Sequence, residues 1–225
     1  MQEHYTQEIE DLKTNLFKMA ALVDEQIERA MKSLQENDLE IIKGIKAKDH
    51  EIDAYDNLIK TQCENILAIF QPVASDLRYI MSVIMVNANL ERCGDIAINI
   101  SRRVKRTSEH HNLLIESNLI EMSKIARQMV KDSIDSFINL DLDLANKSLS
   151  EDESVDEINR AAFRFFIAKM QENPSLIEPC SHLIVLSRLI ERLADHATHI
   201  SENLIFYVEA KLIAHRKKLE KRENE

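Results

Sequence analysis

The scarcity of glycine and proline constrains this chain more than any other feature of its sequence. Only two glycines and three prolines occur in 225 residues. Barrels, sandwiches and doubly wound sheets need turns at short intervals, and turns rely heavily on these two residues. We therefore expect long helices joined by few connections. Apolar residues make up 44% of the chain, without any Trp, which is enough for a core of aliphatic side chains.

Apolar residues recur every three or four positions along almost the whole chain, which is the spacing of one helix face. Asn37-Asp38 is expected to cap the second helix, and Ser75 or Asp76 the third. Helix ends are predicted near residues 35, 70, 106, 138 and 170, and a sixth helix is predicted from about 179 to beyond 213.

The second half of the sequence repeats the first. Acidic residues of the second helix recur at an offset of 103, namely Asp38, Asp49 and Asp53 as Asp141, Asp152 and Asp156. Residues of the third helix recur at an offset of 100, namely Glu91-Arg92, Asp95 and Ile100 as Glu191-Arg192, Asp195 and Ile200. The sequence therefore predicts an all-α fold of two tandem three-helix bundles, with six long helices, over 1–110 and 111–225, related by internal duplication.

The charge balance excludes several classes of function. The chain carries 29 basic and 39 acidic residues, a net charge of −10, whereas binding to nucleic acid or an anionic membrane favours a basic face. Its longest nearly apolar stretch, 79–86, is far shorter than the roughly 20 residues of a membrane span. The polar N-terminus does not resemble a signal peptide, so we expect a cytoplasmic protein. Cys63, Cys93 and Cys180 are expected to be buried, reduced thiols.

Each half contains two acidic pairs spaced four residues apart. The pairs are Asp49/Asp53, Glu91/Asp95, Asp152/Asp156 and Glu191/Asp195. On a helix this spacing stacks two carboxylates on one face, and their repulsion costs a few tenths of a kcal/mol unless a cation offsets it. Composition alone would produce roughly seven such pairs in the chain. A solvated acidic face therefore remains an alternative.

The position of the pairs about the turns favours a shared site. Asp53 lies 19 residues before Pro72 and Glu91 lies 19 after it, while Asp49 and Asp95 are each 23 away. Folding the two helices back at the turn places four carboxylates at one level, about 28 Å from the turn. The second half repeats this symmetry about the break between its own second and third helices.

Four carboxylates at one level would form an oxygen-rich site for a hard or borderline ion, with Mg, Mn or Fe preferred to Zn. The predicted ligands are Asp49, Asp53, Glu91, Asp95, Asp152, Asp156, Glu191 and Asp195. A carboxylate-bridged oxidase of the ferritin-like kind would need Glu-x-x-His motifs. None of the eight histidines has Glu three positions before it, so we do not expect an enzyme. A metal-free helical adaptor remains open.

Two segments, 71–100 and 189–210, carry a resemblance to a known family. The first contains Glu91-Arg92-Cys93-Gly94-Asp95-Ile96-Ala97, and the second contains Glu191-Arg192-Leu193-Ala194-Asp195-His196-Ala197. This repeated E-R-x-G-D-x-A frame resembles the PhoU family of bacterial phosphate-uptake regulators. The second copy has Ala194 where the family usually has Gly.

The resemblance implies two similar three-helix bundles, usually in a homodimer, that bind multinuclear iron or zinc clusters through the acidic motifs. It also implies a negative regulator of phosphate-starvation signalling that contacts the ATPase subunit of the phosphate importer and the phosphate-sensing histidine kinase. We therefore expect a cytoplasmic, metal-binding regulator without catalytic activity, loaded with Fe, Zn, Mn or Mg. Such a protein would not bind nucleic acid and would reach the membrane only through its partners.

Overall fold

The computed structural model describes residues 2–210, with the backbone alone at 2, 46 and 47. Its six long helices are α1 (Gln2–Glu36), α2 (Ile45–Phe70), α3 (Ala74–Thr107), α5 (Leu119–Asn139), α6 (Leu142–Glu172) and α7 (Ile177–Glu209). Three short elements join them, η1 (Ser108–His110), α4 (His111–Glu116) and η2 (Pro174–Leu176). No strand occurs in this range. The predicted all-α fold with six long helices is confirmed.

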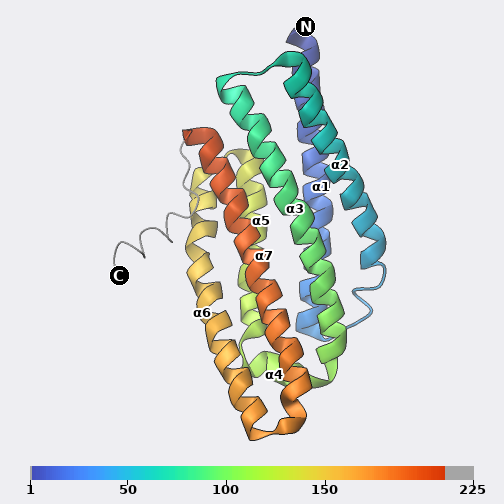
Figure 1. The fold of residues 1–225 in the computed structure, drawn as a ribbon, viewed down its shortest axis with the longest axis vertical. Coiled ribbons are helices and arrows are strands. Elements are labelled where there is room, and N and C mark those ends of the chain that lie inside the picture. The colour runs from blue at the N-terminus through green and yellow to red at the C-terminus, as the bar shows by residue number, and fades with distance from the viewer. Residues whose placement is uncertain (1, 211–225) are drawn as a thin grey trace, which may run out of the picture.

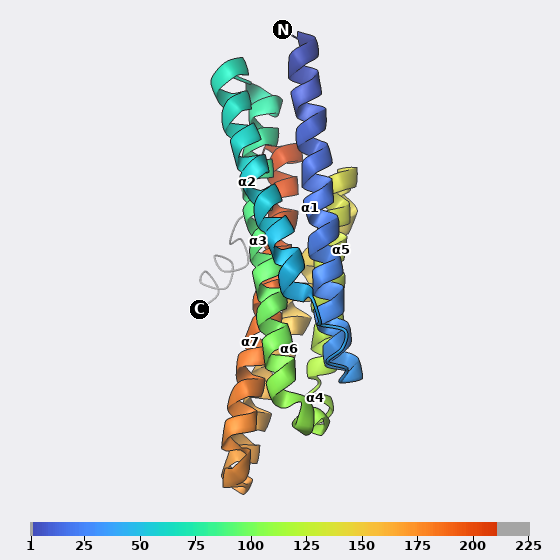
Figure 2. The same ribbon diagram turned by 90° about the vertical axis from the view of Figure 1, so that its right-hand side faces the viewer.

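Helices α1, α2 and α3 pack together as one bundle, and α5, α6 and α7 pack as a second. The bundles meet along two seams, where α3 lies against α7 and α1 against α5. In Figure 1, a half-turn about the line of sight exchanges α3 with α7 and α2 with α6. Figure 2 shows the two layers from the side, with α3 and α7 on the left and α1 and α5 on the right. The duplication thus produces a pseudo-twofold arrangement. The division after residue 110 stays a prediction.

Helices α3 and α7 run antiparallel along the front seam. Four polar contacts join them. Near the start of α3, Arg78 Nε donates to the Tyr207 carbonyl and Ser82 Oγ to the Asn203 carbonyl, both at 3.3 Å. Further along, Asn89 Oδ1 lies 2.9 Å from His196 Nδ1, and Arg103 lies 2.7 Å from His182 Nδ1. In these four pairs, a higher residue number on α3 goes with a lower residue number on α7. The centre of this seam therefore lies near the Arg92 and Arg192 positions, and both arginines act on His196.

The seam between α1 and α5 is complementary in charge. Glu28 of α1 pairs with Arg127 of α5 at 3.4 Å, and Asp24 lies within electrostatic reach of Arg127 and Lys131. Asp24 and Arg127 occupy equivalent positions of the duplication, as do Glu28 and Lys131. At these four positions the first bundle supplies the acids and the second supplies the bases, while Asp135 of α5 adds one acid on the side of the second bundle.

Buried apolar side chains from both halves form one continuous core. All three cysteines lie in it as free thiols, as the sequence predicts, and burial raises the pKa of Cys63 to about 12. No helix in residues 2–210 is both long and apolar enough to cross a bilayer.

The second helix begins later than the sequence predicts. Asp38 accepts a hydrogen bond from the Glu40 amide at 2.9 Å and so caps a turn instead of a helix. Arg29 of α1 donates to the carbonyls of Ile41 at 3.0 Å and Lys43 at 2.8 Å. Gly44 then takes a left-handed φ of 79° before the helix starts. Because Arg29 binds these carbonyls, they need no helical partners.

Two further helix ends differ from the prediction. Helix α3 starts at Ala74 after an extended Val73, ahead of the expected caps Ser75 and Asp76. Helix α7, predicted to run past 213, ends at Glu209, because Ala210 adopts a left-handed φ of 55°. The predicted continuation, 211–225, lies outside the described residues.

Candidate functional site

The first acidic cluster lies between α2, which carries Asp49 and Asp53, and α3, which carries Glu91 and Asp95. Burial raises the pKa of Asp49, and repulsion from Asp53 and Asp95 raises it further. Burial likewise raises the pKa of Glu91, with further repulsion from Asp95 and Asp53. The four predicted residues are therefore close enough to disfavour one another's charge, which a bound cation would relieve.

A buried glutamine supports this cluster from α1. Gln26 Nε2 donates to the Gly94 carbonyl at 3.1 Å and contacts Asp49 Oδ1 at 3.5 Å. The side chain is fully buried, and its Oε1 has no hydrogen-bond partner among the described residues. The acidic motifs of the sequence do not point to Gln26. A polar residue directly before Ile27, on the apolar face of the helix, is the signal that could have revealed it.

Gly94 allows close packing behind the first cluster. A Cβ at this position would lie 3.3 Å from Ile52 Cδ1. The second half has Ala194 at the equivalent position, and the smaller Val155 stands where the first half has Ile52. The second half therefore carries an extra methyl group on α7, at Ala194. The first half carries it on α2, at Ile52.

The second acidic cluster lies between α6 and α7. Burial raises the pKa of Glu191, and Asp195 and Asp156 raise it further, while Arg188 opposes the shift. Arg188 contacts Glu191 at 3.4 Å, and Arg160 contacts Asp156 at 3.5 Å. The second cluster is therefore partly neutralised by its own arginines.

Asp152 completes the predicted set, on the turn of α6 before Asp156, and its side chain is half-buried. Within 2–210, no three His, Cys, Asp or Glu side chains gather closely enough to hold a metal ion. The clusters thus supply carboxylate oxygens of the kind that hard ions prefer, without a formed coordination shell. Metal binding at these eight residues stays a prediction.

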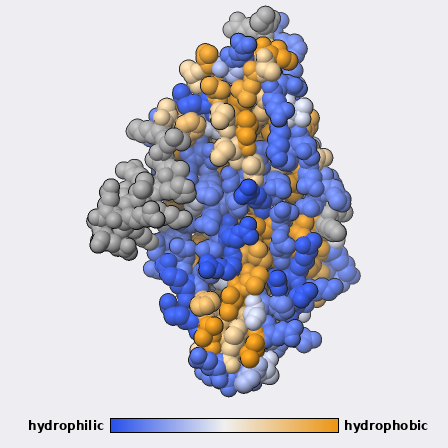
Figure 3. Space-filling view, in the orientation of Figure 1, coloured by the Kyte–Doolittle hydropathy of each residue, from blue (hydrophilic) through white to orange (hydrophobic). Residues whose placement is uncertain are grey.

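The α3/α7 face carries exposed apolar side chains at both ends. Leu77, Met81 and Met85 are exposed on α3, as are Ile177 and Val185 on α7. Figure 3 shows these apolar stripes above and below a hydrophilic band across the middle of the face. Leu77 and Ile177 are equivalent in the duplication, as are Met85 and Val185. Exposed apolar groups in a polar frame are typical of protein-binding surfaces.

Comparison with known sequences identifies relatives of the whole chain. A family model described as the PhoU domain matches residues 16–104 and again 119–204. A phosphate-specific transport system accessory protein PhoU homolog from Aquifex aeolicus is 36% identical, over 96% of this chain and 98% of its own. The homolog from Caulobacter vibrioides is 31% identical, over 92% of both chains.

Comparison with solved structures gives the same relationship. PhoU from Pseudomonas aeruginosa matches with a TM-score of 0.85 and 30% identity, over 92% of this chain and 100% of that one. The phosphate transport system regulatory protein PhoU from Streptococcus pneumoniae matches with a TM-score of 0.82 and 28% identity, over 92% and 98% of the two chains. The similarity therefore covers both bundles and their relative placement.

Proposed function

Because this chain belongs to the PhoU family, we propose that it is a metal-binding, non-catalytic regulator of phosphate uptake and of phosphate-starvation signalling. The observation that carries the proposal is the duplicated acidic motif. In each half, one motif glutamate has its pKa raised by burial and by neighbouring carboxylates. Its relatives are named accessory proteins of the phosphate-specific transport system, and this supports the regulatory role.

The proposed partners are the ATPase subunit of the phosphate importer and the phosphate-sensing histidine kinase. The apolar stripes of the α3/α7 face are the proposed contact surface, which would place docking beside the acidic clusters. We also propose that the chain works in the cytoplasm as a homodimer, and light scattering at several concentrations tests the dimer.

Capture of each purified partner tests the docking role. Met85→Asp places a charge on the α3/α7 face at a side chain that is 51% exposed, and Ile115→Asp is the matched control on α4, 57% exposed. We expect Met85→Asp to weaken capture of at least one partner and Ile115→Asp to leave it unchanged. Failure of the metal-loaded wild type to retain either partner would overturn this part of the proposal.

The proposed ligand sets are Asp49, Asp53, Glu91 and Asp95 in the first half and Asp152, Asp156, Glu191 and Asp195 in the second. Their all-carboxylate chemistry suits Fe, Mn or Mg, and the family resemblance adds Zn. A bound ion would remove the mutual repulsion of the carboxylates and could order the face on which partners dock.

Elemental analysis by mass spectrometry, on protein purified without chelator, tests the metal sites. We expect Asp95→Ala to lower the metal content of the first half and Asp195→Ala that of the second. The exposed Glu121→Ala is the control. Circular dichroism should show nearly unchanged helix content in all three variants. Wild-type protein without bound metal would leave only a metal-free adaptor.

A further inference from the structure

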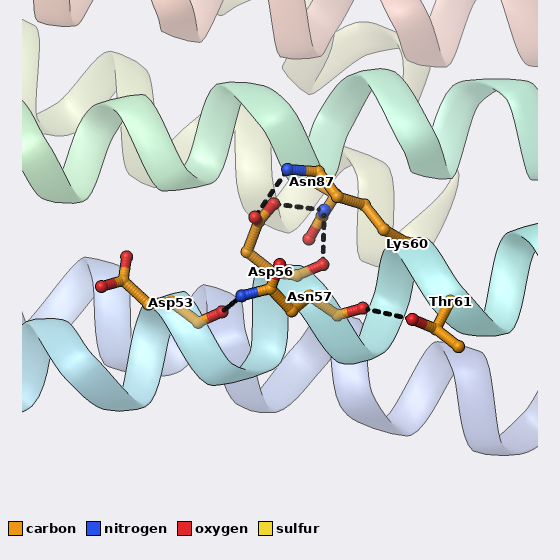
Figure 4. Close-up of polar contacts among 6 residues, drawn as sticks. All are labelled: Asp53, Asp56, Asn57, Lys60, Thr61 and Asn87. Carbon is orange, nitrogen blue, oxygen red and sulfur yellow. Dashed lines mark hydrogen bonds and ion pairs between the residues drawn. The ribbon is translucent and has the colours of Figure 1, made fainter.

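The groove between the second and third helices differs between the two halves in a way that the acidic motifs do not explain. In the first half, a carboxylate occupies the groove. Asp56 is buried and accepts a hydrogen bond from Asn87 Nδ2 at 2.7 Å. Lys60, one turn further along the same helix, donates from Nζ to Asp56 Oδ2 at 2.6 Å. Figure 4 shows Asp56 between Asn87 and Lys60, with Asn57 and Thr61 on the same helix as Asp56.

The second half has lost this carboxylate and its lysine. Asn159 stands at the position of Asp56, and Ser187 stands at that of Asn87. Ser187 Oγ donates to Asn159 Oδ1 at 2.7 Å, so a buried polar pair remains but is neutral. Phe163 replaces Lys60. The second groove therefore contains neither the carboxylate nor the ammonium group that the first groove has at this level.

Three arginines surround the same place. Arg160, Arg164 and Arg188 stand where the first half has Asn57, Thr61 and Ala88. Together with Asn159, Phe163, Ile184 and Ser187 they line a cavity of about 250 Å³. The second half has therefore exchanged an internal carboxylate for an open cavity edged by guanidinium groups.

Two of the three arginines, Arg160 and Arg188, pair with acids that lie outside the cavity. Arg160 contacts Glu153 at 2.9 Å, in addition to its contact with Asp156. Arg164 makes no ion pair with any described residue. Because the Asn159 oxygen already accepts from Ser187, its amide nitrogen remains to donate into the cavity. The cavity thus offers donors from two helices, and none of its lining residues is a carboxylate.

We propose that this cavity binds a phosphate group, either free inorganic phosphate or the phosphate of a small organic molecule. Guanidinium forks match phosphate oxygens and stay protonated. Arginines on both sides of a cavity can contact a tetrahedral group from several directions, whereas one fork satisfies a planar carboxylate. Phe163 and Ile184 supply an apolar wall for the organic part of a larger ligand.

Calorimetric titration of the full chain, treated with chelator, tests the proposal without any contribution from metal. Inorganic phosphate and adenosine monophosphate are the two probes. We expect Arg164→Gln to weaken binding by about tenfold or more, because it removes a charge-assisted hydrogen bond. Lys18→Gln, which removes one positive charge from an exposed side chain on α1, is the charge-matched control and should bind like the wild type.

A second variant restores the arrangement of the first half. Asn159→Asp with Phe163→Lys places a carboxylate and its lysine in the cavity, so it should abolish binding while thermal unfolding shows a folded protein. Binding of phosphate alone, or only of adenosine monophosphate, would identify the source of the group. Absence of binding for both probes, or equal loss in Arg164→Gln and Lys18→Gln, would overturn the proposal. None of the substituted residues is a proposed metal ligand, and elemental analysis of the same variants measures their metal content independently, so the two proposals can fail separately.

Discussion

Gly94 offers a sharp test of how the helices pack behind the first acidic cluster. Gly94→Ala would place a Cβ 3.3 Å from Ile52 Cδ1, a few tenths of an ångström inside ordinary contact. The second half tolerates Ala194 because Val155 has no Cδ1 atom. If this account is correct, Gly94→Ala should be harmful alone and become harmless when Ile52→Val accompanies it.

The magnitudes follow from opposing terms. Alanine in place of glycine favours a helix by about 1 kcal/mol, and overpacking against the flexible end of Ile52 should cost about 1–2 kcal/mol. Gly94→Ala should therefore destabilise the protein by about 0–1 kcal/mol. Ile52→Val alone should cost about 1 kcal/mol. In the double variant, the nearest remaining contact is Ile52 Cγ2 at 3.7 Å, so its stability should be close to that of the wild type.

Urea unfolding of the wild type, the two single variants and the double variant measures the coupling free energy. We expect about 1–2 kcal/mol in favour of the pair. Gly94→Ala combined with Ile66→Val, a buried residue elsewhere on α2, is the control and should be additive. Additivity within about 0.3 kcal/mol for Gly94 and Ile52 would refute the packing argument.

Two further predictions concern buried polar groups. Burial holds the pKa of His196 down to about 4, so below pH 6.5 the unfolded state binds a proton that the folded state does not. Stability should fall between pH 6.5 and 4 by about 2 kcal/mol more in chelator-treated wild type than in His196→Gln, and parallel urea midpoints would contradict this. Asp56→Ala leaves the buried Asn87 amide and the Lys60 ammonium without their acceptor and should cost about 3 kcal/mol. Asn159→Ala removes only a neutral partner and should cost about 1–2 kcal/mol; equal urea unfolding losses would refute the distinction.

The sequence predicted the helices because their apolar spacing is continuous and the breaks at Pro72 and Pro174 are unambiguous. It misplaced the start of α2 because Leu39 and Ile42 continue the helical spacing. The decisive interactions there come from Arg29, on a different helix, and no local pattern can report such a partner. The C-terminal end of α7 was mispredicted for a similar reason, because nothing in the local composition marks Ala210 as the left-handed residue that ends the helix.

The position of the candidate site along the helices was predictable, but the side of each helix on which its carboxylates lie was not. Residue counts from the turn place Asp53 and Glu91 at one level, whereas the side of the helix that each faces depends on the packing of α2 against α3. The arginine cavity was accessible in principle, because aligning the halves sets Arg160 and Arg164 against Asn57 and Thr61. A single sequence gives that contrast no meaning until the groove between the two helices is known.

The charges on the α1/α5 seam decide which half recognises which. Two copies of the first bundle would bring Asp24 and Glu28 against their own equivalents, and two copies of the second would oppose Arg127 and Lys131 in the same way. At these four positions only unlike halves attract, and this attraction outnumbers the one repulsion that Asp135 of α5 adds against Asp24, so the seam discriminates against mispairing between nascent chains. Fragments separated in the α3–α5 connection should therefore reassemble with each other in preference to forming homotypic pairs.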